Sequence, residues 1–129
     1  MAKVTACNGK ENYLVEIGSP TGNKVIADEP VDKGGKDNGF SPKELLASAL
    51  ATCTNVTVRM FADRKEWDVQ NVQVEIELVE EESKTTFQRS VTFKGNLDDT
   101  QRKRLLAVAN ACPIHKILTH EIAVETIMK

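Results

Sequence analysis

The chain has 129 residues, of which 40% are hydrophobic and 28% charged, with a net charge of -2 and an isoelectric point near 5.7. This size and composition predict one globular domain spanning residues 1–129. The chain has no basic stretch of the kind that binds nucleic acid, and no apolar run near the roughly 18 residues of a membrane helix. The N-terminus also lacks the apolar core of a signal peptide. We therefore expect a cytoplasmic protein that engages neither nucleic acid nor membrane.

The first thirty residues predict short strands joined by tight turns. Residues 12–17 carry β-forming side chains, residues 18–23 are dense in turn formers, and residues 24–28 form the expected returning strand. Residues 32–39 are polar and glycine-rich, which indicates a loop.

A long helix is predicted from Pro42 to about Lys65. Ser41 and Glu44 have the spacing of a capping box, in which each side chain bonds the other's backbone N–H. Pro42 suits the first helical position. Apolar side chains recur at spacings of three and four, so we expect one face to be buried. The residues of this face are Leu45, Ala49, Cys53, Val56 and Met60, with Leu46 and Leu50 beside them.

The second half of the chain predicts a hairpin, two helices and a closing strand. Residues 69–80 and 85–95 alternate between apolar and polar side chains, as antiparallel strands with one wet face do. A helix is expected from Asp98 to Asn110, and a shorter one over residues 113–118. Residues 121–127 alternate again and predict a last strand. This order indicates an α+β fold with largely antiparallel pairing. The side chains expected to point inward from the first of these helices are Leu105, Leu106, Val108 and Ala109.

Two of the three cysteines stand where thiol chemistry is plausible. Cys112 directly precedes Pro113, which places it at a helix N-cap, where free backbone N–H groups and the helix dipole lower a thiol pKa. Cys53 lies inside the long helix and needs a nearby cation or hydrogen-bond donors to be reactive; inert packing is its alternative interpretation. If the fold brings the two sulfur atoms together, they can cycle between dithiol and disulfide. Cys7 is interpreted as incidental, and the odd count argues against a secreted disulfide framework.

A zinc site is a weaker hypothesis. Cys112 and His115 have a spacing that two zinc ligands can share, and Cys53 with one carboxylate could complete the set. Glu44 is explained by capping alone, although it is also a candidate to hydrogen-bond a cation near the thiol.

Both cysteine segments resemble motifs of the OsmC/Ohr family. The first is Ser-Pro-Lys-Glu-Leu-Leu-Ala-Ser-Ala-Leu-Ala-Thr-Cys, residues 41–53, and the second is Ala-Cys-Pro-Ile-His-Lys, residues 111–116. The resemblance implies an OsmC-like fold, in which antiparallel sheets wrap the long central helices of an intertwined homodimer.

The resemblance also implies thiol-dependent reduction of organic hydroperoxides, without metal, flavin or nucleotide. Cys53 would become a sulfenic acid, Cys112 would condense with it to a disulfide, and a dithiol reductant would restore both thiols. Glu44 is the acidic residue that the resemblance adds to the catalytic set.

The chain departs from the family pattern at two places. Active members hold the thiolate with an arginine from the N-terminal strands, but residues 1–58 contain none, which leaves Lys10 or Lys24 as replacements. The position ten residues before Cys53 is Lys43, and the acid follows at Glu44, rotated by about 100° on a helix. These departures motivate an alternative function: an OsmC-like dimer without peroxidase turnover, which binds a small ligand or senses oxidants.

Overall fold

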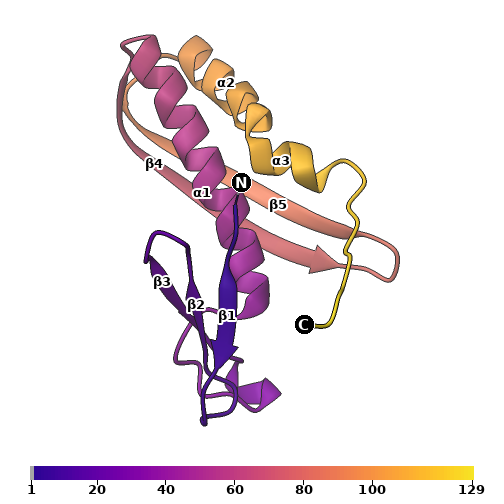
Figure 1. The fold of residues 1–129 in the computed structure, drawn as a ribbon. Helices are drawn as coiled ribbons and strands as arrows, with labels where there is room; N and C mark the ends of the chain where they lie inside the picture. Colours follow the sequence, from indigo (N-terminus) through magenta and orange to yellow (C-terminus); the bar gives the residue numbers. More distant parts are fainter. Residues whose placement is uncertain (1) are drawn as a thin grey trace. The chain divides into compact units, whose positions relative to one another are not determined.

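The computed structural model describes residues 2–129 of the chain (Figure 1). The chain divides into two compact units, the first ending at Leu46 and the second spanning Ala47–Lys129. The long helix α1 (Pro42–Arg64) begins in the first unit and continues in the second. The first unit contributes a β-sheet, and the second contributes a β-hairpin and helices.

The first unit is built on a three-stranded antiparallel sheet. Its strands are β1 (Thr5–Asn8), β2 (Val15–Gly18) and β3 (Lys24–Ala27), and β2 lies between the other two. The predicted strand pair and the tight turn between them are confirmed. The strand β2 begins three residues later than predicted, because Leu14 still closes a turn by donating its N–H to the carbonyl of Glu11.

The polar loop after β3 is organised by one buried carboxylate. Asp28 accepts the backbone N–H groups of Glu29, Lys36 and Asn38 at 2.8, 3.3 and 3.1 Å. These donors lower the pKa of the Asp28 carboxyl, the Asn38 N–H most strongly. The loop contains a short 3-10 helix, η1 (Val31–Lys33), and returns to the sheet through a bridge between Ala27 and Phe40.

The start of α1 is the predicted capping box. The N–H of Ser41 donates to the Glu44 carboxylate at 2.9 Å, and the N–H of Glu44 donates to the Ser41 hydroxyl at 3.2 Å. The helix ends one residue before the predicted Lys65. No membrane-spanning helix was predicted from the sequence, but by length and composition α1 could cross a membrane. A core helix of a soluble protein passes the same test.

The buried face of α1 differs from the predicted one. Val56 and Met60 are exposed, and the fully or largely buried positions follow a spacing of four. The buried face lies one to two positions further along the helix than the predicted one. It includes a threonine, whose hydroxyl donates to the backbone of its own helix. The buried residues are Leu50, Thr54, Val58 and Ala62.

The second unit packs helices on one face of a long hairpin. The strands β4 (Asp68–Glu80) and β5 (Thr85–Asn96) pair along their whole length, with a bulge between Val69 and Asn71. Figure 1 shows α1 and α2 (Asp99–Val108) lying side by side against this hairpin. The hydrophobic core forms between them. Its buried residues are Val58, Ala62, Val69, Val72, Phe93, Leu105 and Ala109.

The helices after the hairpin begin where predicted. Asp98 caps α2 through a capping box with Gln101, and Cys112 is the N-cap of α3 (Pro113–Leu118). A single 3-10 turn, η2 (Ala109–Ala111), joins the two helices. Leu106 was expected to point inward but is exposed, because it lies beside, rather than on, the face that carries Leu105.

The closing strand predicted at residues 121–127 is not formed. These residues have no regular secondary structure, and Val124 is 87% exposed. An alternating segment becomes a strand only when a neighbouring strand supplies hydrogen-bond partners, and nothing in the described part of this chain pairs with it.

Candidate functional site

The two cysteines singled out from the sequence meet in the second unit. The thiols of Cys53, on α1, and Cys112, at the N-cap of α3, are hydrogen-bonded to each other, and both are free thiols. Cys112 is completely buried, whereas Cys53 is partly exposed. The fold therefore brings together two sulfur atoms that lie far apart in the sequence, and an incoming molecule reaches Cys53 first.

Cys112 is the more acidic thiol of the pair. Burial acts to raise its pKa, but Cys53, the backbone N–H groups of His115 and Ile114, and the neighbouring Thr54 side chain together lower it. The N-cap environment predicted from Pro113 is thus part of the cause.

Cys53 has a raised pKa. Burial is the largest cause, and its hydrogen bond to Cys112 adds to it, while the Ile114 backbone and the Thr57 hydroxyl act in the opposite direction. Of the two thiols, Cys112 is therefore the one that gives up its proton more readily.

An arginine that was not predicted as a site residue bonds side chains close to this pair. Arg89, on β5, donates from Nη1 to the Thr54 hydroxyl oxygen at 3.0 Å. Thr54 is fully buried, and its hydroxyl donates to the Leu50 carbonyl at 2.7 Å. The same hydroxyl is a hydrogen-bond partner of Cys112.

The other arm of Arg89 reaches the segment that carries Cys112. Its Nη2 donates to the Asn110 side-chain oxygen at 2.8 Å and lies 3.2 Å from His115 Nδ1. Because a guanidinium can only donate, His115 Nδ1 must accept, so the ring carries its proton on Nε2. Arg89 thus bonds three elements around Cys112, namely α1, η2 and α3.

The sequence carries a signal for Arg89. On β5 the inward side chains are Phe87, Arg89, Val91 and Phe93, each paired with an apolar residue of β4. A charge in an apolar row is costly unless something uses it. An arginine in phase with the apolar positions of a strand is therefore a candidate site residue.

The remaining predicted residues lie in the first unit. Glu44 is bonded in the capping box described above, and Lys24 forms an exposed ion pair with Glu16 at 3.1 Å. Among residues 2–129 no group of three or more His, Cys, Asp or Glu is arranged to hold a metal ion.

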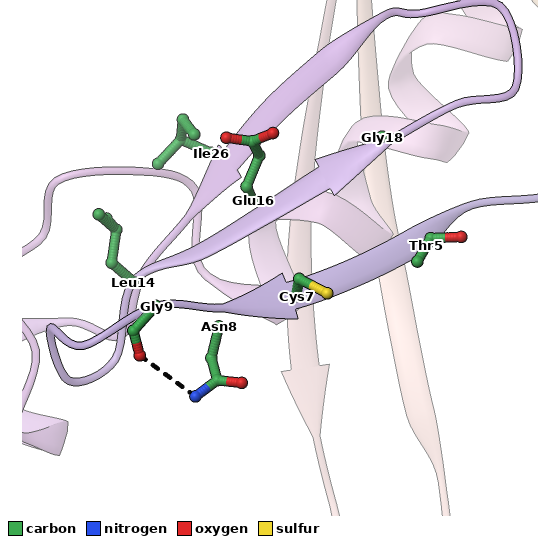
Figure 2. Close-up of a pocket in the computed structure, with 8 residues that line it drawn as sticks. All are labelled: Thr5, Cys7, Asn8, Gly9, Leu14, Glu16, Gly18 and Ile26. Atoms are coloured by element: carbon green, nitrogen blue, oxygen red, sulfur yellow. Dashed lines mark hydrogen bonds between the residues drawn. The ribbon is translucent and has the colours of Figure 1, made fainter. Parts of the chain in front are cut away.

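Two of the hollows on the units lie near cysteines. One, of about 320 Å³, borders the cysteine turn of α1 and is lined by Ala51, Thr52, Asn55, Val56 and Val74. The other, of about 480 Å³, lies on the three-stranded sheet (Figure 2). Cys7 is exposed and lines this second hollow. Beside it, the side-chain amide of Asn8 donates to the Gly9 carbonyl at 3.3 Å.

One protein family matches most of the sequence of this chain. The family described as OsmC-like protein matches residues 34–127, which include both cysteines. The chain belongs to the OsmC-like family. The recognition made from the two cysteine motifs is therefore confirmed.

One relative of this OsmC-like protein is named for resistance to organic hydroperoxides. It is 23% identical to the organic hydroperoxide resistance protein OhrB of Bacillus subtilis over 133 residues, covering 99% of this chain and 96% of OhrB. The OhrB crystal structure matches with a TM-score of 0.66, covering 92% of this chain and 90% of that one at 24% identity.

Two further structures share the fold. A Psychrobacter arcticus protein named for osmotic stress induction and detoxification matches with a TM-score of 0.74 and 29% identity, covering 90% of this chain and 85% of its own. An OsmC-like protein of Mycoplasma pneumoniae matches with a TM-score of 0.75 and 18% identity, covering 92% and 86%. The predicted α+β OsmC-like fold, with antiparallel sheets and a long central helix, is confirmed.

Proposed function

We propose that this OsmC-like protein reduces organic hydroperoxides through the thiols of Cys53 and Cys112. The observation that carries the proposal is the hydrogen bond between the two sulfur atoms, since resolution of a sulfenic acid requires a second thiol within bonding reach. The relation to a protein named for organic hydroperoxide resistance supports the same chemistry.

The difference in exposure assigns the two roles. Cys53 is the accessible sulfur and attacks, after its proton has passed to Cys112 along their hydrogen bond. The Cys53 thiolate bonds the terminal peroxide oxygen, the O–O bond breaks, and the products are a sulfenic acid and an alkoxide, which takes the proton that the pair retained. Cys112 then attacks the Cys53 sulfur, a disulfide forms, and hydroxide leaves. A dithiol reductant returns the pair to the thiol state by exchange.

An alkyl hydroperoxide is the favoured substrate class over hydrogen peroxide. Each buried methylene of the alkyl group contributes about 0.8 kcal/mol to binding. The surface beside the cysteine turn of α1 offers apolar side chains for this, among them Ala51, Val56 and Val74.

The proposal includes a cytoplasmic homodimer without cofactor. The exposed alternating segment at residues 121–127 and the exposed Val56 and Met60 supply apolar surface for a second copy of the chain. Sedimentation at several protein concentrations tests this assembly, and a monomer at every concentration contradicts it.

The decisive experiment measures the consumption of cumene hydroperoxide with a dithiol reductant. We expect turnover in the parent protein, none in Cys53→Ser, and none beyond one equivalent in Cys112→Ser. Cys7→Ser is the matched control and should retain turnover. An unchanged rate in Cys53→Ser refutes the mechanism. Oxidation of the parent by a single equivalent, without turnover, supports the alternative of a stoichiometric oxidant sensor.

Glu44 completes the proposed catalytic set. Glu44→Gln keeps a side chain that can serve the capping box with Ser41. We therefore expect hydroperoxide turnover to fall while the melting temperature stays near the parent value. Turnover equal to the parent in this variant limits Glu44 to capping.

A further inference from the structure

We propose that Arg89 ties the segment that carries Cys112 to α1, and so sets the equilibrium between the dithiol and the disulfide of the Cys53–Cys112 pair. Arg89 is a positioning residue in this inference, because it bonds side chains next to the cysteines and acts through the distance between their sulfur atoms. The inference rests on the proposed use of this pair.

The first arm of Arg89 holds the side of the pair that belongs to α1. Thr54 directly follows Cys53 in the sequence, and its hydroxyl oxygen accepts a hydrogen bond from Arg89 Nη1 at 3.0 Å. The Thr54 hydroxyl in turn donates to the Leu50 carbonyl, which fixes it on the backbone of the helix. This arm is therefore anchored on α1 one residue from the exposed thiol.

The second arm holds the segment that carries Cys112, on both sides of this cysteine. Asn110 lies two residues before Cys112, and its side-chain oxygen accepts from Arg89 Nη2 at 2.8 Å. His115 lies three residues after Cys112, and its Nδ1 lies 3.2 Å from the same nitrogen. One guanidinium therefore connects the helix of the first thiol to both flanks of the second.

The Cys112 segment has little regular structure of its own. Cys112 stands between a single 3-10 turn and a helix of six residues, and residues 119–129 after this helix form neither helix nor strand. The N–H of Cys112 donates to the Ala109 carbonyl at 3.4 Å, which is longer than the usual range of roughly 2.7–3.2 Å. A helix this short is marginally stable without tertiary contacts. The segment therefore depends on bonds to its neighbours for its position.

The strand β5 is a firm base for such a tie. Arg89 pairs with Ile76 of β4, and the register continues without a shift on both sides of this position. Arg89 stands between Phe87 and Val91 in the inward row of the strand, where a guanidinium partly out of water is costly. What arginine adds there is a planar fork that bonds two groups at once, a geometry that lysine lacks.

Holding the two segments together favours the disulfide. The thiols of Cys53 and Cys112 are already in hydrogen-bond contact, and a disulfide needs their sulfur atoms at about 2.05 Å. Reacting groups that are held in the right geometry lose less entropy when they join. Without the tie, the Cys112 segment would have more freedom in the dithiol state, and closing the disulfide would cost more of it.

The test is the equilibrium of the protein with mixtures of reduced and oxidised glutathione at pH 7. One oxidised glutathione and the two protein thiols give the protein disulfide and two reduced glutathione molecules. All variants carry Cys7→Ser, so that the exposed Cys7 takes no part. Acid quenching, alkylation of free thiols and mass spectrometry give the fraction of protein in the disulfide form.

We expect Arg89→Gln and Arg89→Leu to lower the equilibrium constant for the disulfide by about tenfold, the scale of one hydrogen bond to a charged group. For this two-electron couple, tenfold corresponds to a potential that is about 30 mV less negative. Arg89→Lys should lie between these variants and the parent, because it retains the charge but loses the fork. A constant equal to the parent's in folded Arg89→Gln overturns the inference.

Arg102 supplies the matched control. It is also a half-buried arginine of the second unit, and its Nη1 donates to the Phe93 carbonyl at 2.8 Å, which ties α2 to β5 away from the cysteines. Arg102→Gln should leave the equilibrium constant at the parent value. A decrease equal to that in Arg89→Gln overturns the inference, because it would show a general loosening of the fold.

Asn110→Ala keeps the inference testable if the Arg89 variants fail to fold. The Asn110 side chain is exposed, so its loss should leave the fold intact, and it cuts part of the second arm. We expect the equilibrium constant to fall by about threefold, less than for a full hydrogen bond to a charged group, since His115 remains. Combined with Arg89→Leu, the same change should have no further effect, because the tie is already cut. An unchanged constant in Asn110→Ala, or full additivity in the double variant, overturns the inference.

The outcome is separable from that of the proposed function, because the glutathione equilibrium involves no hydroperoxide. Absence of hydroperoxide turnover in a parent protein that forms the Cys53–Cys112 disulfide refutes only the peroxidase proposal. Turnover in the parent together with equal constants in parent and Arg89→Gln refutes only the role of Arg89.

Discussion

Replacing Leu105 by alanine tests whether α2 is packed as described. Leu105 has no exposed surface and lies in the core between α1 and the hairpin. The change deletes three carbons, worth roughly 2.4 kcal/mol at 0.8 per buried group, and leaves a cavity that adds to this. We expect a loss of about 3 to 5 kcal/mol in the free energy of unfolding.

The adjacent leucine gives the matched comparison. Leu106 is on the same helix and is 55% exposed, so its alanine variant should lose only about 1 kcal/mol. Urea denaturation followed by circular dichroism, at one protein concentration, measures both variants. Equal losses, or a larger loss for Leu106→Ala, would refute the assignment of the inward face of α2.

Two further predictions concern the backbone and pH. The backbone N–H groups, that of Asn38 foremost, lower the pKa of Asp28 below its usual 3.8, so its contribution is complete above that pH and is lost as pH falls through the lowered value. Acid titration of the melting temperature should therefore be flatter in Asp28→Asn than in the parent, and identical profiles would contradict this. Gly95 has a φ of 149°, and a methyl group there would overlap the Asp68 carbonyl, so Gly95→Ala should cost more than about 1 kcal/mol in denaturation experiments. Gly18→Ala, whose methyl meets nothing within 4 Å, is the control, and an equal cost would refute the argument.

Features that depend on local chemistry were predictable from the sequence. The start of α1 follows from the spacing of Ser41 and Glu44, and the start of α3 from Pro113 after Cys112. The hairpin follows from the alternation of apolar and polar residues, which is strong in the second half of β4 and is interrupted on β5 at Arg89. Each of these signals acts within a few residues, so no knowledge of the tertiary fold was needed.

Features that depend on distant partners were not predictable in the same way. The buried face of α1 includes Thr54, whose polarity argued for exposure until its bonds to the Leu50 carbonyl and to Arg89 were known. The segment at 121–127 has the alternation of a strand, but alternation does not supply a neighbour to pair with.

The candidate site also has one part that the sequence predicts and another part that only the structure shows. Cys53 and Cys112 were found from their motifs, and the structure adds their meeting, which no local signal contains. The arginine was sought among residues 1–58, on the pattern of the family. Arg89 on β5 was not selected, because residues 85–95 were interpreted only as the partner strand of a hairpin.

Arg89 offers a way to separate folding from function within one strand. Replacing a partly buried charge by an apolar side chain of similar reach is often neutral or stabilising. Thr54 would keep its bond to Leu50, and the exposed Asn110 would bond water, so Arg89→Leu should leave few unsatisfied groups. A folded Arg89→Leu protein with an unchanged or higher melting temperature would show that this charge is not needed for the stability of the hydrophobic row in which it stands.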